Sequence, residues 1–275
     1  MPEGPEVKRD ADLIMEAVGH RPAQEVFFGL DKLKDYGPKL SGLEVQSVEP
    51  RGKALLIRFQ DGWNIYTHNQ LYGKWYVRPA GAEPDTNRQL RLAIRNDDGS
   101  ALLYSASQIE VLRDDELDEH DYLSKLGPDP LAGKLNRKQV LERLRDDRFC
   151  NRSLATLLLD QGFLAGIGNY LRAEICFTAG LHPETRPSDC SAEQLKRLAE
   201  ALLEVPRRAY LHEGRTIEPE LSRKLEEEGR PAKDYRRYVY KREGRPCHRC
   251  GNEIVKKSLG GRSGYYCPRC QKSLR

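Results

Sequence analysis

The sequence has no apolar run long enough to cross a membrane. Its 275 residues are 38% hydrophobic and 32% charged, a composition typical of globular proteins. The most apolar stretch, residues 157–171, is interrupted by Asp160, Gln161 and three glycines, whereas a membrane-spanning helix needs about 20 predominantly apolar residues. The first residues also lack the basic and apolar regions of a secretory signal, so the sequence predicts a cytoplasmic protein.

The sequence also lacks the cysteine pattern of a disulfide-stabilised protein. Cys150, Cys176 and Cys190 are isolated, and we interpret them as small buried side chains. The other four form two C-x2-C pairs separated by 16 residues: Cys247, Cys250, Cys267 and Cys270. This spacing is typical of a four-thiolate zinc site, which leaves no coordination position for water or substrate. We therefore predict one structural zinc ion; two disulfides, the alternative, would require an oxidising compartment.

Acidic residues are scarce toward the C-terminal end. Residues 207–275 contain 19 Lys and Arg against 9 Asp and Glu, a net charge of +10, whereas residues 1–206 contain 27 against 33, a net charge of −6. A basic region of this density is typical of a surface that binds phosphate groups, although a merely solvated surface is the alternative. Charge alone therefore leaves nucleic-acid binding as an open hypothesis.

The hydrophobic pattern of the N-terminal part changes from helical to strand-like. Residues 5–18 carry apolar side chains at helical spacing, and residues 43–112 contain short β-rich runs separated by Gly and Asp turns. The predicted strands span residues 43–48, 54–59, 63–67, 75–77, 90–94, 101–104 and 109–112. This order predicts an antiparallel β-sandwich domain over residues 1–126 that opens with an α-helix.

A linker and a helical part follow. Residues 127–130, Gly-Pro-Asp-Pro, cannot continue a helix or a central strand. The predicted helices beyond them span residues 137–145, 154–159, 169–178 and 191–205. The glycine-rich segment 162–168 predicts a tight turn into the third of these helices, and residues 212–234 are interpreted as a loop. We therefore predict a helical domain over residues 131–234.

The last part, residues 238–275, contains the four clustered cysteines and is predicted to be a zinc-ribbon-like finger. Residues 253–266, between the two cysteine pairs, are predicted to form a β-hairpin. Its turn contains Gly260 and Gly261, with Arg262 beside the tip. The complete prediction is an α+β multidomain protein.

Several motifs occur together in one order. They are Met-Pro-Glu-Gly-Pro-Glu at residues 1–6, Gly-Ile-Gly-Asn-Tyr at residues 166–170, and the zinc hairpin. With them the chain resembles the formamidopyrimidine-DNA glycosylase and endonuclease VIII family over essentially its whole length. Gly4 and residues 70–73 and 103–107 resemble the endonuclease VIII branch, which acts mainly on oxidised pyrimidines. The resemblance implies a bifunctional DNA glycosylase and abasic-site lyase of base excision repair, with a helix-two-turn-helix domain.

The first residues have chemistry suited to that activity. Removal of Met1 would expose Pro2 as a secondary amine, and an α-amino group has a pKa of about 7.7 to 8.0, so an unprotonated nucleophile is available near neutral pH. Its adduct with deoxyribose would be a charged iminium, which promotes elimination. Glu3 could donate a proton to the sugar ring oxygen and later accept one. Pro and Glu are also ordinary residues at a helix start, and these two alone leave that alternative open.

The resemblance adds two further residues to the candidate site. It implies that Lys53, in the turn before a predicted strand, assists at the sugar and the adjacent phosphate. Glu6 matches another acidic position of the family, for which the sequence suggests no definite role.

DNA contacts are predicted on three segments. A base inside a duplex must be flipped out before it can react, and the hole must be filled. The resemblance assigns that filling to Gln70, Leu71 and Tyr72; a strand end packed on Trp75 is the alternative. The resemblance also implies that Arg262 binds phosphate at the tip of the hairpin, which the metal ion stiffens. The alternative is that Arg262 is only solvated.

Asn169, at a predicted helix start, is expected to hold another phosphate, with a plain N-cap as its alternative. The expected partner is duplex DNA with an oxidised base or an abasic site, bound by a monomer without membrane association. Two other functions stay open at this point: excision of oxidised purines within the same family, and zinc-dependent DNA binding without catalysis.

Overall fold

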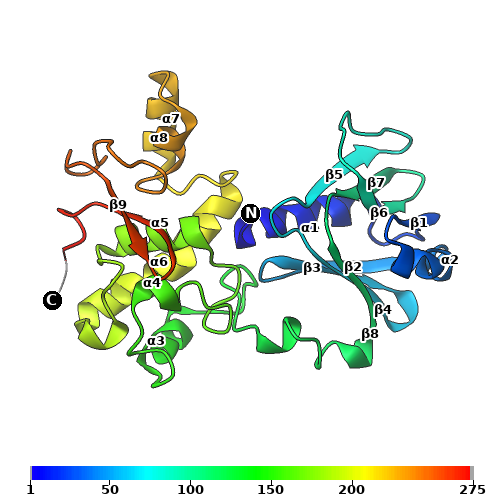
Figure 1. Ribbon diagram of the computed structural model, residues 1–275, viewed down its shortest axis with the longest axis horizontal. Coiled ribbons are helices and arrows are strands. Elements are labelled where there is room, and N and C mark those ends of the chain that lie inside the picture. The colour runs from blue at the N-terminus through cyan, green and yellow to red at the C-terminus, as the bar shows by residue number, and fades with distance from the viewer. Residues whose placement is uncertain (1, 273–275) are drawn as a thin grey trace. The chain divides into compact units, whose positions relative to one another are not determined.

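The computed structural model describes residues 2–272 and divides the chain into two compact units, Met1–Lys125 and Leu126–Arg275 (Figure 1). Their boundary falls directly before the Gly-Pro-Asp-Pro segment at residues 127–130. The second unit contains both the helical segment and the zinc hairpin, so a separate finger over residues 238–275 stays a prediction.

The first unit contains two four-stranded antiparallel sheets, as the sandwich prediction requires. One sheet has the strand order β1-β6-β7-β5, formed by Glu25–Phe28, Leu90–Arg95, Gly99–Tyr104 and Lys74–Pro79. The other has the order β2-β3-β4-β8, formed by Val45–Arg51, Ala54–Phe59, Trp63–His68 and Gln108–Arg113. Short single-turn helices and α2 (Gly37–Leu40) connect the strands.

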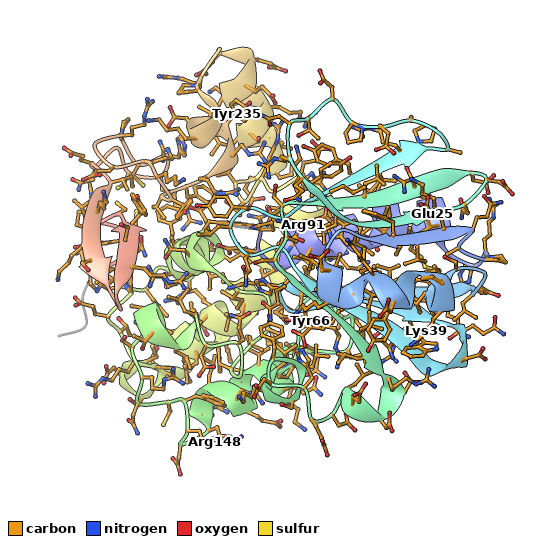
Figure 2. The ribbon with its side chains drawn as sticks, turned by 45° about the vertical axis from the view of Figure 1, so that its right-hand side comes forward. Glu25, Lys39, Tyr66, Arg91, Arg148 and Tyr235 are labelled. Carbon is orange, nitrogen blue, oxygen red and sulfur yellow. The ribbon has the colours of Figure 1, made fainter. Side chains whose placement is uncertain are left out.

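All seven predicted strands are present as β2 to β8. The sequence analysis missed β1, whose four residues alternate between exposed and buried positions. A strand this short offers only Val26 and Phe28 as buried apolar positions, too few to establish a period. Glu25 (labelled in Figure 2) starts this strand and pairs with Arg95 of β6 at 3.0 Å.

The opening helix α1 (Gly4–Val18) is anchored by one apolar face. Val7, Ala11, Ile14 and Val18 are at most 1% exposed, at the helical spacing that the sequence predicts. They pack against strands of both sheets, and burying each of the larger side chains contributes about 1.5–3 kcal/mol. This packing fixes the start of the helix, and with it the position of Pro2.

The second unit is mainly helical. Its longer helices are α3 (Arg137–Arg145), α5 (Asn169–Ala179) and α6 (Ala192–Leu211), with one turn of helix in α4 (Leu154–Leu157). Helix α6 extends six residues beyond its predicted end at Val205 and continues through the buried Pro206. Among the described residues, no helix combines the length and the apolarity needed to cross a membrane.

The interpretation of residues 212–234 as a loop is wrong. They contain α7 (Pro219–Glu227) and most of α8 (Ala232–Arg236). Leu221 and Leu225, one helical turn apart, pack in one cluster with Ile217 and Tyr238. The charged run of three glutamates obscured this short apolar face, because only two apolar residues of α7 define it.

The zinc hairpin has the predicted geometry. Strands β9 (Val255–Leu259) and β10 (Arg262–Tyr266) pair antiparallel, with Leu259 opposite Arg262. Gly260 and Gly261 form the two-residue turn with φ angles of 58° and 75°, which favour glycine. A Cβ atom on Gly260 would also lie 2.9 Å from the Thr156 side chain, so the tip approaches α4 closely.

Candidate active site

The N-terminal end of α1 holds the predicted nucleophile and its neighbour. Pro2 is partly buried in the extended segment before the helix, and Glu3, only 6% exposed, is the N-cap residue. The backbone N–H of Glu3 donates a hydrogen bond of 3.0 Å to Glu6 Oε2. Glu6, for which the sequence suggested no definite role, thus fixes the backbone that carries Glu3. Both carboxyl groups lie at the positive end of the helix dipole.

Lys53 lies in the tight turn between β2 and β3, where Gly52 has a φ of 64°. The backbone N–H of Lys53 donates a hydrogen bond of 3.0 Å to Tyr122 Oη, and the Tyr122 ring lies 5.6 Å from the His68 ring. Burial, and secondarily the positive charge of Lys53, lower the pKa of His68, which favours a neutral imidazole.

His68 connects this turn to the predicted insertion residues. Its Nδ1 accepts a hydrogen bond of 3.0 Å from the backbone N–H of Gln70. The structure thereby brings the segment of Lys53 and the segment of Gln70 together through one histidine that the sequence analysis did not single out.

A buried aromatic cluster supports this part of the site. Tyr66 of β4 (labelled in Figure 2) is fully buried, with its ring 4.4 Å from His120 and 6.1 Å from Tyr122. His120 Nε2 lies 3.3 Å from a carboxylate oxygen of Glu110, and its Nδ1 accepts a hydrogen bond from the N–H of Tyr122. The cluster therefore holds the Tyr122 segment against the strands that lead to Lys53 and His68.

The turn between β4 and β5 exposes large apolar side chains. Leu71 is 65% exposed and Tyr72 71% exposed, so the alternative of a strand end packed on Trp75 is wrong for both. Gln70 has a φ of 48°, and its side-chain amide bonds to Ser107 and Gln108 at 3.1 Å each. Exposed apolar residues on a rigidly held turn are suited to entering an apolar space such as a base stack.

The four clustered cysteines fit a zinc ion. All their Sγ atoms lie within 4.8 Å of one another, with Cys247–Cys270 at 3.9 Å and Cys250–Cys267 at 3.5 Å. A tetrahedron with Zn–S bonds of about 2.3 Å has edges of about 3.8 Å. The backbone N–H of Asn252 lowers the pKa of Cys250, whereas burial raises the pKa of Cys267 and Cys270, as expected when four thiols share one site without the charge of a metal ion. These cysteines hold one structural zinc ion.

Arg172 of α5 holds the zinc hairpin in place. Its guanidinium, 1% exposed, donates hydrogen bonds to the carbonyl oxygens of Ala155 at 2.7 Å, Leu259 at 3.1 Å and Ser263 at 3.2 Å. These carbonyls belong to α4 and to both hairpin strands. Arg262 lies in the sequence between Leu259 and Ser263. Its side chain is exposed and makes no ion pair with any residue from 2 to 272.

Asn169 is not the plain N-cap of α5, because Gly168 occupies that position. Asn169 is the first helical residue, and its Nδ2 donates a hydrogen bond of 3.0 Å to the Ser263 carbonyl. Its Oδ1 is buried and accepts no hydrogen bond from the described part of the chain. The predicted contact of Asn169 with phosphate stays a prediction.

Comparisons with known proteins agree with this arrangement over the whole chain. Residues 1–108 match the formamidopyrimidine-DNA glycosylase N-terminal domain, residues 126–220 match the H2TH domain of the same enzyme, and residues 244–272 match the zinc finger found in FPG and IleRS. Endonuclease 8 of Escherichia coli is 46% identical over 271 residues, covering 98% of this chain and 100% of the relative. Endonuclease 8 of Shigella flexneri is likewise 46% identical over 271 residues, with the same coverage of both chains. The chain belongs to the formamidopyrimidine-DNA glycosylase family.

Solved structures share the fold. Lactococcus lactis Fpg bound to DNA containing an oxidised pyrimidine has a TM-score of 0.78 and 23% identity, covering 99% of this chain and 100% of that one. The same protein bound to DNA containing N7-benzyl-Fapy-dG has a TM-score of 0.79, also with 23% identity and the same coverage. As a family member close to endonuclease 8 over its full length, the chain is a DNA glycosylase and abasic-site lyase of base excision repair, with DNA as its partner.

In this glycosylase, helix α5 contributes a second polar anchor that the sequence analysis missed. The fully buried Glu174 carboxylate accepts hydrogen bonds of 2.8–2.9 Å from the backbone N–H groups of Tyr238, Val239 and Tyr240, and one of 2.6 Å from the Thr216 hydroxyl. Arg172 and Glu174 lie in a helix buried on nearly all sides, so no amphipathic period could have marked them.

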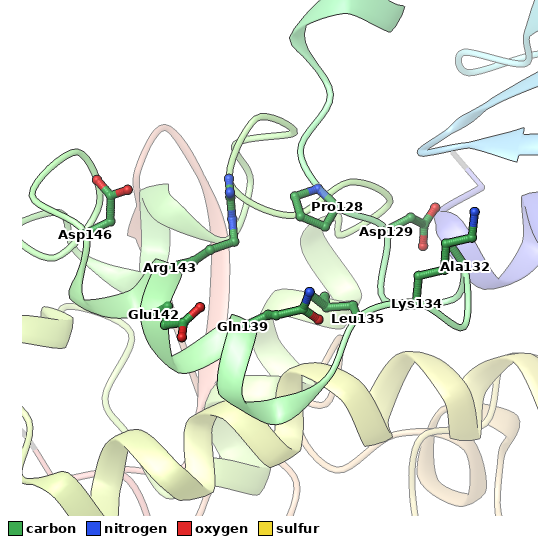
Figure 3. A pocket seen from close by; sticks show the side chains of 9 residues that line it. All are labelled: Pro128, Asp129, Ala132, Lys134, Leu135, Gln139, Glu142, Arg143 and Asp146. Atoms are coloured by element: carbon green, nitrogen blue, oxygen red, sulfur yellow. The ribbon is translucent and has the colours of Figure 1, made fainter.

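A cavity in the second unit of this glycosylase is lined by none of the predicted site residues. It has a volume of about 530 Å³ and is lined by residues of the segment 128–135 and of α3, including Asp129, Lys134 and Arg143 (Figure 3). None of its nine lining residues is a predicted catalytic or DNA-contact residue. The DNA duplex itself is bound over an extended surface, which a single concave pocket does not mark.

Proposed function

We propose that the enzyme excises oxidised bases, mainly pyrimidines, through a covalent intermediate on Pro2. The lone pair of the Pro2 nitrogen attacks C1′ of the flipped nucleoside, and the glycosidic bond breaks with release of the base. Glu3 protonates the ring oxygen as the sugar opens, which gives an iminium between Pro2 and C1′. Loss of a proton from C2′ then expels the 3′ phosphate, and a second elimination expels the 5′ phosphate.

The observation that carries this proposal is the burial of Glu3 directly beside Pro2. An acid that must give up a proton and later accept one benefits from restricted access of water. Glu3 is 6% exposed, its backbone N–H is held by Glu6 at 3.0 Å, and it directly follows Pro2 in the sequence, which supports this pairing of acid and amine.

The DNA contacts complete the proposal. Gln70, Leu71 and Tyr72 fill the space left by the flipped nucleotide, Lys53 assists at the sugar and its phosphate, and Arg262 and Asn169 bind phosphate on the second unit. The exposure of Leu71 and Tyr72 supports the first of these roles, and the anchored hairpin tip supports that of Arg262. We further propose that the enzyme acts as a monomer in the cytoplasm.

Borohydride trapping tests the covalent step. Reduction in the presence of damaged duplex should convert the iminium into a stable protein–DNA conjugate. Pro2→Gly should still be trapped because an amine remains, whereas an acetylated N-terminus should give no conjugate. Retention of Met1 in fully active enzyme would contradict the role of Pro2.

The same assay on a panel of lesions tests the substrate class. Release of oxidised thymine and oxidised cytosine should exceed that of oxidised guanine placed opposite cytosine. The reverse order would assign the enzyme to oxidised purines, without affecting the proposed covalent chemistry.

A further inference from the structure

The turn that carries the exposed side chains is held by hydrogen bonds at both of its ends. At the first end, the side-chain amide of Gln70 bonds to Ser107 and Gln108 at 3.1 Å each. At the other end, Arg88 Nη1 donates a hydrogen bond of 2.5 Å to the carbonyl oxygen of Tyr72. The sequence analysis did not single out Arg88, which lies 16 positions from its partner along the chain.

Arg88 extends from a loop that is itself attached to the sheet. The loop joins β5 to β6, and its Glu83 carboxylate pairs with Arg95 of β6 at 2.8 Å. Next to Arg88, the carbonyl oxygen of Gln89 accepts a hydrogen bond of 2.9 Å from the backbone N–H of Ser105. The chain is thus fixed to the sheet on both sides of Arg88.

The turn is compact enough for a restraint on Tyr72 to act on its neighbours. The carbonyl oxygen of Asn69 accepts a hydrogen bond of 2.7 Å from the N–H of Gly73, which closes the turn. A Cβ atom on Gly73 would lie 2.6 Å from that oxygen, so only glycine allows this close approach. In a closed turn of this size, a displacement of the Tyr72 carbonyl also moves the backbone of Leu71.

We propose that Arg88 is a positioning residue, which through the Tyr72 carbonyl holds the turn of residues 70–72 in the conformation that enters DNA. This inference rests on the proposed insertion of these residues, and it adds the side chain that restrains them. Leu71 and Tyr72 have little packing of their own, because both side chains are largely exposed. Fixing their backbone before DNA binds lowers the conformational entropy that insertion costs.

Direct binding of phosphate by Arg88 is the alternative role. The guanidinium is exposed and, within residues 2–272, forms no ion pair with a carboxylate. The two roles differ in their salt dependence. A phosphate contact contributes about 1 to the slope of log affinity against log salt, whereas a bond to a carbonyl of the protein itself contributes nothing. Arg88→Met should therefore retain the wild-type slope in binding titrations with damaged duplex.

A double-mutant cycle tests whether Arg88 acts through the turn. Single-turnover excision of thymine glycol from duplex DNA is measured for Arg88→Met in two backgrounds, the wild type and Leu71→Ala/Tyr72→Ala. In the wild type, Arg88→Met should slow excision about fivefold, the loss expected for one hydrogen bond. In the second background it should change the rate by less than about twofold, because no exposed side chain is left to position.

Two further measurements separate positioning from a general loss of structure. An abasic site in single-stranded DNA leaves no hole in a duplex, so Arg88→Met should cleave this substrate at the wild-type rate. Arg78→Met is the matched control, because Arg78 on β5 donates its hydrogen bond to the carbonyl of Val77 and not to the turn. This control should excise thymine glycol from duplex DNA at the wild-type rate.

Unchanged excision by Arg88→Met in the wild-type background would overturn the inference. So would an equal loss in both backgrounds, an equal loss on the single strand, or a salt slope reduced by about 1. Wild-type excision by Leu71→Ala/Tyr72→Ala would instead show that the proposed insertion is wrong, and the inference with it. None of these results bears on the covalent chemistry of Pro2, which borohydride trapping tests separately.

Discussion

At the residue scale, the surroundings of Glu3 suit the proton transfer proposed for it. The residue begins a helix, where a carboxylate is stabilised by the unpaired backbone N–H groups of the first turn. It is nonetheless almost excluded from solvent, and Glu6 restrains its backbone. A group held in this way can meet the sugar ring oxygen at a fixed place, whereas an exposed glutamate on the same helix would sample many orientations.

Glu3→Gln should abolish base excision, with a loss of at least about 100-fold, because an amide cannot protonate the ring oxygen. Cleavage of a strand that already contains an abasic site should be retained. Excision and abasic-site cleavage are measured on the same labelled oligonucleotide. Glu16→Gln, an exposed position on the same helix, is the control and should behave as the wild type. Equal loss of both activities would contradict the role in ring opening.

At the scale of elements, α5 is the helix on which the second unit is assembled. Its buried polar residues face in different directions: Arg172 holds α4 and both strands of the hairpin, and Glu174 holds residues 238–240. The zinc ion closes the two cysteine pairs, and the guanidinium–carbonyl contacts of Arg172 hold the hairpin against α4 and α5.

Arg172→Met should leave the zinc content unchanged while lowering affinity for damaged duplex roughly tenfold, because the hairpin backbone that carries Arg262 loses its anchor. The free energy of unfolding should fall by roughly 2–4 kcal/mol, since three carbonyl groups lose a charged donor. Metal analysis, binding titration and urea unfolding measure these effects. Arg148→Met, at an exposed arginine labelled in Figure 2, should change none of them. Unchanged DNA affinity in folded, zinc-loaded Arg172→Met would contradict the positioning role.

At the scale of the whole molecule, the net charge of +4 conceals an uneven distribution. The last 69 residues carry +10 and include the zinc hairpin, whereas the rest of the chain carries −6. Binding of DNA releases counterions in proportion to the phosphates that are neutralised. The affinity of this enzyme for DNA should therefore fall steeply with salt concentration. Each residue that contacts phosphate should account for part of the slope of log affinity against log salt.

Arg262→Ala should reduce the slope of log affinity against log salt by about 1, as expected for the loss of one phosphate contact. The loss of affinity should be similar for different lesions, because phosphate contacts carry no sequence information. Binding titrations at several salt concentrations measure the slope. Lys34→Ala is the control, because Lys34 is an exposed lysine paired with Asp31 on the first unit. An unchanged slope for Arg262→Ala would show that the hairpin tip does not bind phosphate.

The sequence was informative wherever a feature depends on neighbours along the chain. The period of the apolar residues predicted α1 and seven strands, and the glycine pair predicted the hairpin turn. The spacing of the cysteines predicted the zinc site, because two C-x2-C pairs can close a tetrahedron in few geometries. The opening residues, the segment 166–170 and the zinc hairpin together indicated the family for the same reason, since each motif consists of residues close together in the sequence.

Tertiary structure alone decided the contacts between distant segments. Lys53 meets Tyr122 across 69 positions, and Asn169 meets Ser263 across 94. The contacts of Arg172 depend on the burial of its charged group and on which carbonyl groups face it, and neither has a local signature in sequence. Local spacing thus determined the elements and the chemistry of this enzyme, whereas the packing of those elements determined which side chains hold that chemistry in place.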